Sequence, residues 1–188
     1  MLAAIIIPIV VVVGIIILIF LIGIGLYNSI VSLRNRIDNA WSQIDVQLRK
    51  RYDLIPNLVE TVKGYAKHEK GIMEKVTAAR SMLMNAEGIV SKMKAGNVLS
   101  NAMGKLFAIA ENYPQLKANE NFLQLQTELA AIEDKIAYAR QYYNDSIQSY
   151  NTLCTTFPGI MFASLYGKEQ KEYLQLPEAQ KAVPKISF

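Results

Sequence analysis

The sequence contains one cysteine and one histidine in 188 residues. A single cysteine excludes an intrachain disulfide and a cysteine-based zinc site. A single histidine cannot supply the two Glu-x-x-His motifs of a di-metal helical bundle. The sequence also has no phosphate-binding loop, nucleophile elbow or dinucleotide-binding motif. We therefore expect a protein that is not an enzyme and that holds no metal or other cofactor.

Two further features are scarce: strand-like alternation and a surplus of charge of one sign. No stretch alternates between apolar and polar residues over the length of a strand, which predicts an all-α fold. The formal net charge is only +4, from 20 basic and 16 acidic residues that are interleaved along most of the chain. A dedicated nucleic-acid-binding protein would concentrate its basic residues far more strongly, so no nucleic acid partner is expected.

The apolar run from Leu2 to Leu26 contains no charged or hydrogen-bonding side chain. It exceeds the roughly 20 residues that a helix needs to cross a bilayer. A cleaved signal peptide would need a basic start and a shorter apolar core, and a lipoprotein would need a cysteine near the end of the run. We expect an uncleaved single-pass anchor that contacts membrane lipids. The basic residues follow the run, beginning at Arg34, which favours an outside N-terminus and a cytoplasmic domain.

The residues after the anchor form one apolar helix face with steps of three and four. This face predicts a core made by Trp41, Ile44 and Leu48, on a helix that continues the anchor to about Lys67. Pro56 predicts a kink or a brief break in this helix, because it lacks a backbone N–H. The first hairpin turn is expected at residues 67–70.

Three further helices are predicted from heptad spacing and turn residues. The second helix carries Val76 to Met93 and is expected to end at Gly96-Asn97; a short third spans residues 98–112. The last long helix has the most regular stripe, with core positions at Leu129, Ile132 and Ile136. The fold class is therefore all-α: a transmembrane helix continuing into a three- to four-helix antiparallel bundle with coiled-coil-like heptad packing. The expected divisions are 1–26 as transmembrane anchor, 27–167 as helical bundle and 168–188 as a tail packed on or beside the bundle.

The candidate contact residues are basic and aromatic. Adjacent tyrosines cannot both face a core, so one of Tyr142 and Tyr143 is expected at an oligomer interface. His68, at the predicted hairpin turn, and Cys154, on an apolar stripe, are better explained as a polar turn residue and a small buried residue than as catalytic groups. The candidates for lipid or partner contact are Arg34 and Arg36, near the anchor, and Arg49, Lys50 and Arg51, for which a protein partner and a solvated face remain open.

The stretch that follows the anchor resembles the LemA family. The most specific part of the resemblance is the motif Asp-Leu-Ile-Pro-Asn-Leu-Val at residues 53–59. The resemblance implies a single-pass bacterial membrane protein with a helical, coiled-coil-like domain and no established reaction. The other matching residues are Tyr27, Asn28, Leu33, Arg36, Ala40, Trp41, Ile44, Gln47, Leu48, Arg51, Thr61, Val62, Gly64, Tyr65, Val76, Ala79, Arg80, Tyr150, Asn151, Phe157 and Pro158.

These observations lead to one functional hypothesis and two alternatives. The leading hypothesis is a membrane-anchored, non-enzymatic helical scaffold of the LemA type, which self-associates at the bacterial cell membrane as a homo-oligomer larger than a dimer. Acidic residues such as Glu128, Glu133 or Asp134 of one copy could meet the basic cluster of another. The first alternative is an adaptor that binds a membrane protease or envelope enzyme. The second is a signalling or enzymatic bundle that uses His68.

Overall fold

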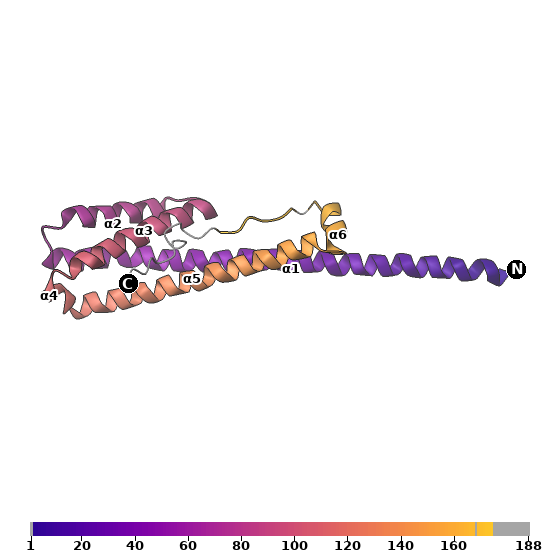
Figure 1. Cartoon of the computed structure of the whole chain (residues 1–188), viewed down its shortest axis with the longest axis horizontal. Coiled ribbons are helices and arrows are strands. Elements are labelled where there is room, and N and C mark those ends of the chain that lie inside the picture. The colour runs from indigo at the N-terminus through magenta and orange to yellow at the C-terminus, as the bar shows by residue number, and fades with distance from the viewer. Residues whose placement is uncertain (1, 168, 175–188) are drawn as a thin grey trace, which may run out of the picture. The chain divides into compact units, whose positions relative to one another are not determined.

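The computed structural model describes residues 2–167 and 169–174, and this part of the chain is built from helices with no strand (Figure 1). This confirms the predicted all-α fold class. The helices in the described part are α1 (Leu2–Tyr65), α2 (Lys70–Met84), α3 (Ile89–Ala110), α4 (Pro114–Lys117), α5 (Glu120–Thr155) and α6 (Gly159–Leu165).

The chain forms two compact units, and the long helices α1 and α5 each contribute to both. Among the described residues, the first unit contains residues 2–40, 143–167 and 169–173, and the second contains residues 41–142 and 174. The end of the apolar run packs against α6 within the first unit. The division into anchor, bundle and tail stays a prediction.

Helix α1 continues through Pro56 for 64 residues without the predicted break. Pro56 cannot donate a hydrogen bond to the carbonyl of Tyr52, four residues earlier. Arg80 of α2 supplies the missing donor, because its Nε lies 2.9 Å from the Tyr52 carbonyl oxygen. The Arg80 guanidinium also lies 6.0 Å from the centre of the Tyr52 ring. The helix therefore stays continuous because a neighbouring helix satisfies the carbonyl that the proline leaves unpaired.

Helices α2 and α3 form a hairpin in the second unit (Figure 1). The turn that joins them lies earlier than the sequence predicts. Gly88 adopts a φ of +76°, which is accessible to glycine without strain, and α3 begins directly after it. The predicted end at Gly96-Asn97 is wrong, since both residues lie inside α3. Gly96 is buried, and its small size serves close packing rather than helix termination.

The core of the second unit uses the predicted stripes. Ile44 and Leu48 of α1 and Leu129, Ile132 and Ile136 of α5 are buried, whereas Trp41 is only half-buried. A half-buried side chain loses less on truncation than the fully buried tryptophan that the stripe predicts. The other buried apolar residues of this unit include Ile55, Leu58, Val62, Val76, Leu83, Leu99, Leu106, Leu116 and Phe122.

The first unit has its own smaller core, in which α1 packs with the second half of α5 and with α6. Asn151 of α5 is 9% exposed and holds the chain after α6: its Nδ2 donates to the Lys171 carbonyl, and the Lys171 N–H donates to its Oδ1, each at 2.9 Å. The predicted tail starts here, but residue 168 and residues 175–188 lie outside the described residues. The buried residues of this unit include Ile30, Ile37, Ala40, Tyr143, Ile147, Tyr150, Cys154 and Ala163.

Candidate functional site

Arg51 is the most deeply buried charged residue of the described chain, with 1% of its surface exposed. It extends from α1 toward α3 and α5 within the second unit. Its Nη1 donates to Glu133 and, at 2.8 Å, to the hydroxyl of Ser100, while its Nη2 lies 2.8 Å from the Gly96 carbonyl oxygen. Burial lowers the pKa of Arg51, and the charge of Glu133 opposes that shift. The guanidinium thus links α1 to α3 through two hydrogen bonds and to α5 through an ion pair with Glu133, whose side chain is 48% exposed.

Gly96 makes room for this arrangement. A Cβ atom at position 96 would lie 3.0 Å from Nη2 of Arg51 and 3.1 Å from Cδ2 of Leu48. The prediction that Arg51 contacts lipids or a partner is therefore wrong, because its side chain is enclosed by its own fold. Glu133, one of the acidic residues that could meet the basic cluster of a neighbouring copy, pairs with Arg51 of the same chain.

The other four basic candidates, Arg34, Arg36, Arg49 and Lys50, lie on the exposed surface of α1. Arg49 pairs with Asp45 at 3.0 Å and still exposes 62% of its side chain. Lys92 of α3 also bonds Asp45. Burial alone would raise the pKa of Asp45, but Lys92 and then Arg49 outweigh it, so the net pKa is lowered. Whether these four residues contact lipid or a partner remains a prediction.

A groove lined by tyrosines lies on the second unit. Its volume is about 440 Å³, and it runs between α1 and α5, with Val46, Lys135, Tyr138 and Tyr142 among its lining residues. Tyr138 is 73% exposed and Tyr142 is 45% exposed. Exposed tyrosines beside an exposed valine are typical of protein interfaces. The groove gives the predicted interface residue Tyr142 a concave setting.

Tyr143, the other interface candidate, is 5% exposed and belongs to the core of the first unit. Burial raises the pKa of its phenol, and the nearby charge of Asp38 adds to this shift. The expectation that Tyr143 contributes to an oligomer interface is therefore corrected. The sequence argument that only one of the two adjacent tyrosines can face a core agrees with this arrangement, since Tyr142 is the exposed one.

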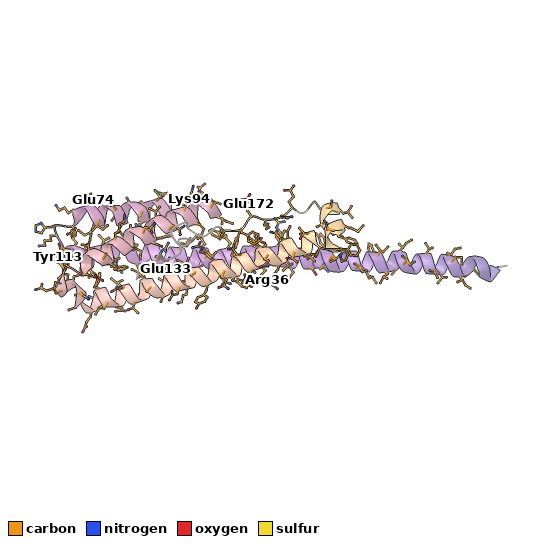
Figure 2. All side chains as sticks on the ribbon, viewed as in Figure 1. Arg36, Glu74, Lys94, Tyr113, Glu133 and Glu172 are labelled. Atoms are coloured by element: carbon orange, nitrogen blue, oxygen red, sulfur yellow. The ribbon has the colours of Figure 1, made fainter. Side chains whose placement is uncertain are left out.

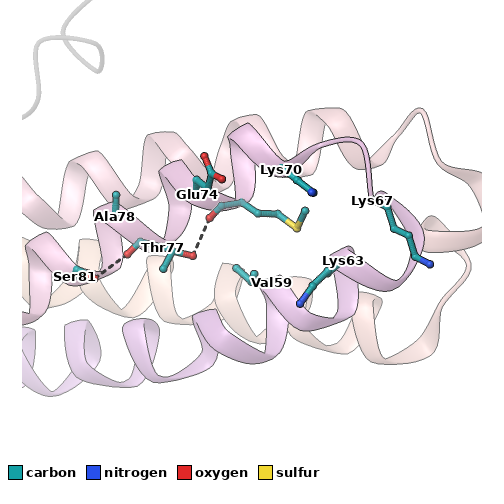
Figure 3. Close-up of a pocket in the computed structure, with 9 residues that line it drawn as sticks. Val59, Lys63, Lys67, Lys70, Glu74, Thr77, Ala78 and Ser81 are labelled. Carbon is teal, nitrogen blue, oxygen red and sulfur yellow. Dashed lines mark hydrogen bonds between the residues drawn. The ribbon is translucent and has the colours of Figure 1, made fainter.

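A second groove, of about 690 Å³, lies between the end of α1 and α2 (Figure 3). Val59, Met73 and Ala78 supply apolar lining. Lys63, Lys67 and Lys70 stand around one end of it (Figure 3). An apolar floor bordered by ammonium groups suits a segment that carries both apolar and acidic side chains.

The apolar segment of α1 is exposed from Ile6 to Ile22. Its large apolar side chains from Ile6 to Ile24 are 42–67% exposed and project outward from the helix (Figure 2). Among the described residues, α1 is the one helix long and apolar enough to cross a membrane. A surface of this kind is stable in hydrocarbon and costly in water.

The two residues considered for catalysis belong to different units. His68 is exposed in the turn between α1 and α2, and Cys154 is buried in the first unit. Burial raises the pKa of the Cys154 thiol, and its hydrogen bond with Tyr150 offsets this only in part. A nucleophilic thiol needs the opposite shift. Neither residue carries an argument for a reaction.

Several residues that shape these sites were not singled out from the sequence. Val46, Lys135 and Tyr138 line the tyrosine groove. Tyr138 and Tyr142 are four residues apart and so share a helix face, which is the signal that could have identified the groove. Ser100 offered no comparable signal, because its role depends on where Arg51 reaches.

Comparison with known proteins shows the family of the chain. The model of the LemA family matches residues 40–188. Similar proteins include magnetosome protein MamQ 1 of Paramagnetospirillum magneticum, 25% identical over 79% of this chain, and magnetosome protein MamQ of Magnetospirillum gryphiswaldense, 26% identical over 78%. Protein LemA of Metamycoplasma hominis is 29% identical over 73% of this chain. In each case the match covers 64% of the relative's length. The chain belongs to the LemA family.

Proposed function

We propose that the protein is a non-enzymatic, membrane-anchored helical scaffold that self-associates at the bacterial membrane. The observation that carries this proposal is that one helix, α1, begins as an exposed apolar segment and ends as part of a folded helical unit with an exposed tyrosine groove. The first part suits a bilayer and the last part suits protein contacts. Membership of the LemA family agrees with this combination.

Self-association is supported by two apolar surfaces on the second unit. One is the tyrosine groove, and the other surrounds the turn between α2 and α3, where Met82, Met84 and Val90 are 55%, 48% and 67% exposed. When two different surfaces of neighbouring copies bind each other, each dimer still has one free surface of each kind. Further copies can therefore add, which gives rings or rows. Anchoring in one plane raises the effective concentration of the copies. We therefore propose a homo-oligomer larger than a dimer.

Light scattering or native mass spectrometry of the detergent-extracted full-length protein tests this proposal. The wild type should contain more than two copies at micromolar concentration, and Tyr138→Asp should reduce that number by placing a charge in the groove. Tyr173→Asp is the matched control, because Tyr173 is 50% exposed in the other unit. A monomeric wild type, or equal effects of both variants, would remove the groove from the proposal.

The proposed orientation places the N-terminus outside and the helical part in the cytoplasm. Arg34 and Arg36 follow the apolar segment and are exposed, so they are suited to contact anionic head groups on the cytoplasmic side. Protease added to right-side-out vesicles should spare the helical part until the vesicles are lysed. Digestion before lysis would reverse the orientation.

The adaptor alternative is favoured by the lysine-bordered groove of about 690 Å³. In this alternative a membrane protease or envelope enzyme presents an amphipathic acidic segment to it, and exposed Arg49 and Lys50 add to the attraction. Cross-linking followed by purification from membranes should recover one partner that is lost in Lys63→Glu/Lys67→Glu. The partner should remain in Lys94→Glu/Lys105→Glu, a charge-matched control on the exposed surface of α3. Equal recovery from both variants would exclude the groove as the contact.

A further inference from the structure

Helix α6 presents large apolar side chains to its surroundings in the first unit. Phe157, directly before the helix, is 79% exposed, and Met161 and Leu165, one turn apart on the helix, are 64% and 76% exposed. Ile160 beside them is 48% exposed. Side chains of this size clustered on one short element mark a surface that contacts something apolar.

The position of α6 along α1 indicates what that apolar material is. The ring of Phe162 lies against Gly23, with its Cε1 atom only 2.9 Å from where a Cβ at position 23 would be. The Tyr166 hydroxyl donates to the Gly23 carbonyl oxygen at 3.3 Å. Gly23 lies within the apolar run, shortly before its end at Leu26. A helix that packs at this point lies at the depth where the apolar run ends.

Aromatic residues reinforce this assignment. The rings of Tyr27 and Tyr166 meet edge to face, with centroids 5.1 Å apart. Tyr27 directly follows the apolar run, and tyrosines are enriched where a membrane-spanning segment meets the head groups. The pair therefore suits the boundary between hydrocarbon and head groups, with α6 held beside it.

Charge is absent from both segments that meet here. Residues 146–167 contain no Asp, Glu, Lys or Arg, and neither do residues 2–33. Contact with the acyl boundary would therefore dehydrate no charged side chain. Polar residues lie to one side of α6, where Thr155, Ser164, Glu169 and Gln170 help to line a hollow.

The local fold fixes where α6 points. Gly159 begins the helix, and a Cβ at that position would lie 2.0 Å from the Leu153 carbonyl oxygen, so only glycine fits. The absence of a side chain lets the start of α6 lie against α5, and Gly23 lets Phe162 pack against α1 on the other side. The exposed apolar row is thus part of a fixed element.

We propose that α6 and Phe157 form a second, non-spanning membrane anchor that lies in the lipid interface beside α1. Phe157, Met161 and Leu165 enter the boundary between head groups and acyl chains, as in helices that lie in the plane of a membrane. The proposal rests on the membrane anchoring of α1 put forward above. A spanning helix alone is free to rotate about its axis. A second contact stops that rotation and fixes how the first unit is turned about the membrane normal.

The experiment uses spin-labelled cysteines in the full-length protein, reconstituted in lipid nanodiscs, with Cys154→Ala removing the native thiol. Single cysteines at Met161, Ile16 and Gln148 are labelled in turn, and the accessibility of each to oxygen and to a water-soluble nickel chelate is measured. Gln148 is the water-exposed reference on α5, and Ile16 reports on the anchor itself. Met161 should favour oxygen over the chelate, as Ile16 does, and Gln148 should show the opposite preference. Leu165 provides a second α6 position and should behave as Met161 does.

The outcomes separate the two proposals. A chelate-accessible Met161 with an oxygen-accessible Ile16 would overturn the interfacial position of α6 and leave the anchor intact. A chelate-accessible Ile16 would overturn the anchor. Coverage of α6 by a second copy of the chain would also overturn the inference. In that case Met161 would be protected from both oxygen and the chelate, and the protection would disappear in nanodiscs that hold one copy.

Two glycine substitutions provide a matched comparison within α1. Gly23→Leu should shift Met161 toward the chelate-accessible state, because the new side chain occupies the place of the Phe162 ring. Gly14→Leu should leave Met161 unchanged, since nothing lies within 4 Å of a Cβ at position 14. Ile16 should stay in the bilayer in both variants. No difference between the two variants would show that packing on Gly23 does not hold α6 at the membrane.

Discussion

Replacing Gly96 by alanine should destabilise the protein, although alanine is the better helix former. An alanine in place of an unstrained interior glycine stabilises a helix by about 0.5–1 kcal/mol. At position 96 the new methyl group lies 3.0 Å from Nη2 of Arg51 and 3.1 Å from Cδ2 of Leu48. Arg51 cannot easily withdraw, because Gly96, Ser100 and Glu133 all hold its guanidinium. Overpacking of this kind costs about 1–3 kcal/mol, which leaves a net loss of about 1 kcal/mol.

Gly104→Ala is the control in the same helix. Nothing lies within 4 Å of a Cβ at position 104, so this substitution should stabilise the protein by the propensity term alone. The two variants should therefore differ by about 2 kcal/mol, or about 4–8 °C in Tm for a chain of this size. Thermal unfolding of the detergent-solubilised full-length protein, followed by circular dichroism and by the fluorescence of Trp41, measures the difference. Equal stabilisation by both substitutions would refute the packing of Arg51 against Gly96.

Three further predictions concern polar contacts of the second unit. Glu133→Gln should lower the unfolding free energy by about 1–3 kcal/mol, because it leaves the buried Arg51 charge with neutral acceptors only. Adding Arg51→Met should recover part of this loss in thermal melts, and simple additivity of the two substitutions would contradict the pairing. Arg80→Leu should cost about 1–2 kcal/mol of stability, because it leaves the Tyr52 carbonyl unpaired. Pro56→Ala should restore stability by supplying a backbone N–H to that carbonyl, so a double-mutant cycle should show coupling between the two positions rather than independence. The pKa of Asp45 is lowered from 3.8, so the ionised carboxylate stabilises the fold above pH 3.8 and this stabilisation is lost as the pH falls through the lowered pKa. Asp45→Asn should therefore flatten the dependence of Tm on pH below pH 3.8. An unchanged dependence would count against the pairing of Asp45 with Lys92 and Arg49.

The helical fold could be predicted because its signals are local. Apolar residues three and four apart mark the buried faces of α1 and α5, and Ile44, Leu48 and Ile136 lie where these stripes place them. The ends and interruptions of helices were harder to predict from the sequence. Pro56 predicts an interruption from its own chemistry, but the donor that compensates for it comes from Arg80, a residue far away in the chain.

The contact residues were harder to predict, because a charged or aromatic side chain can be placed on either side of a helix surface. Arg51 belongs to the same basic cluster as Arg49 and Lys50, yet it alone turns into the core, where Glu133 neutralises it. The spacing from Leu48 to Arg51 puts both on one face, which is the signal for burial that its charge concealed. The proposal for α6 needed the structure, since the packing of Phe162 on Gly23 cannot be inferred from the spacing of residues in the sequence.

Counting copies without detergent tests the scaffold proposal most directly. The full-length protein, fused to a fluorescent label and expressed at low level, is extracted from its membrane in native nanodiscs, and photobleaching steps are counted in single particles. More than two steps in most particles of the wild type, falling in Tyr138→Asp and unchanged in Tyr173→Asp, is the result expected for an anchored scaffold that associates through the tyrosine groove. Single-step bleaching of the wild type at the same expression level would contradict self-association and favour the adaptor.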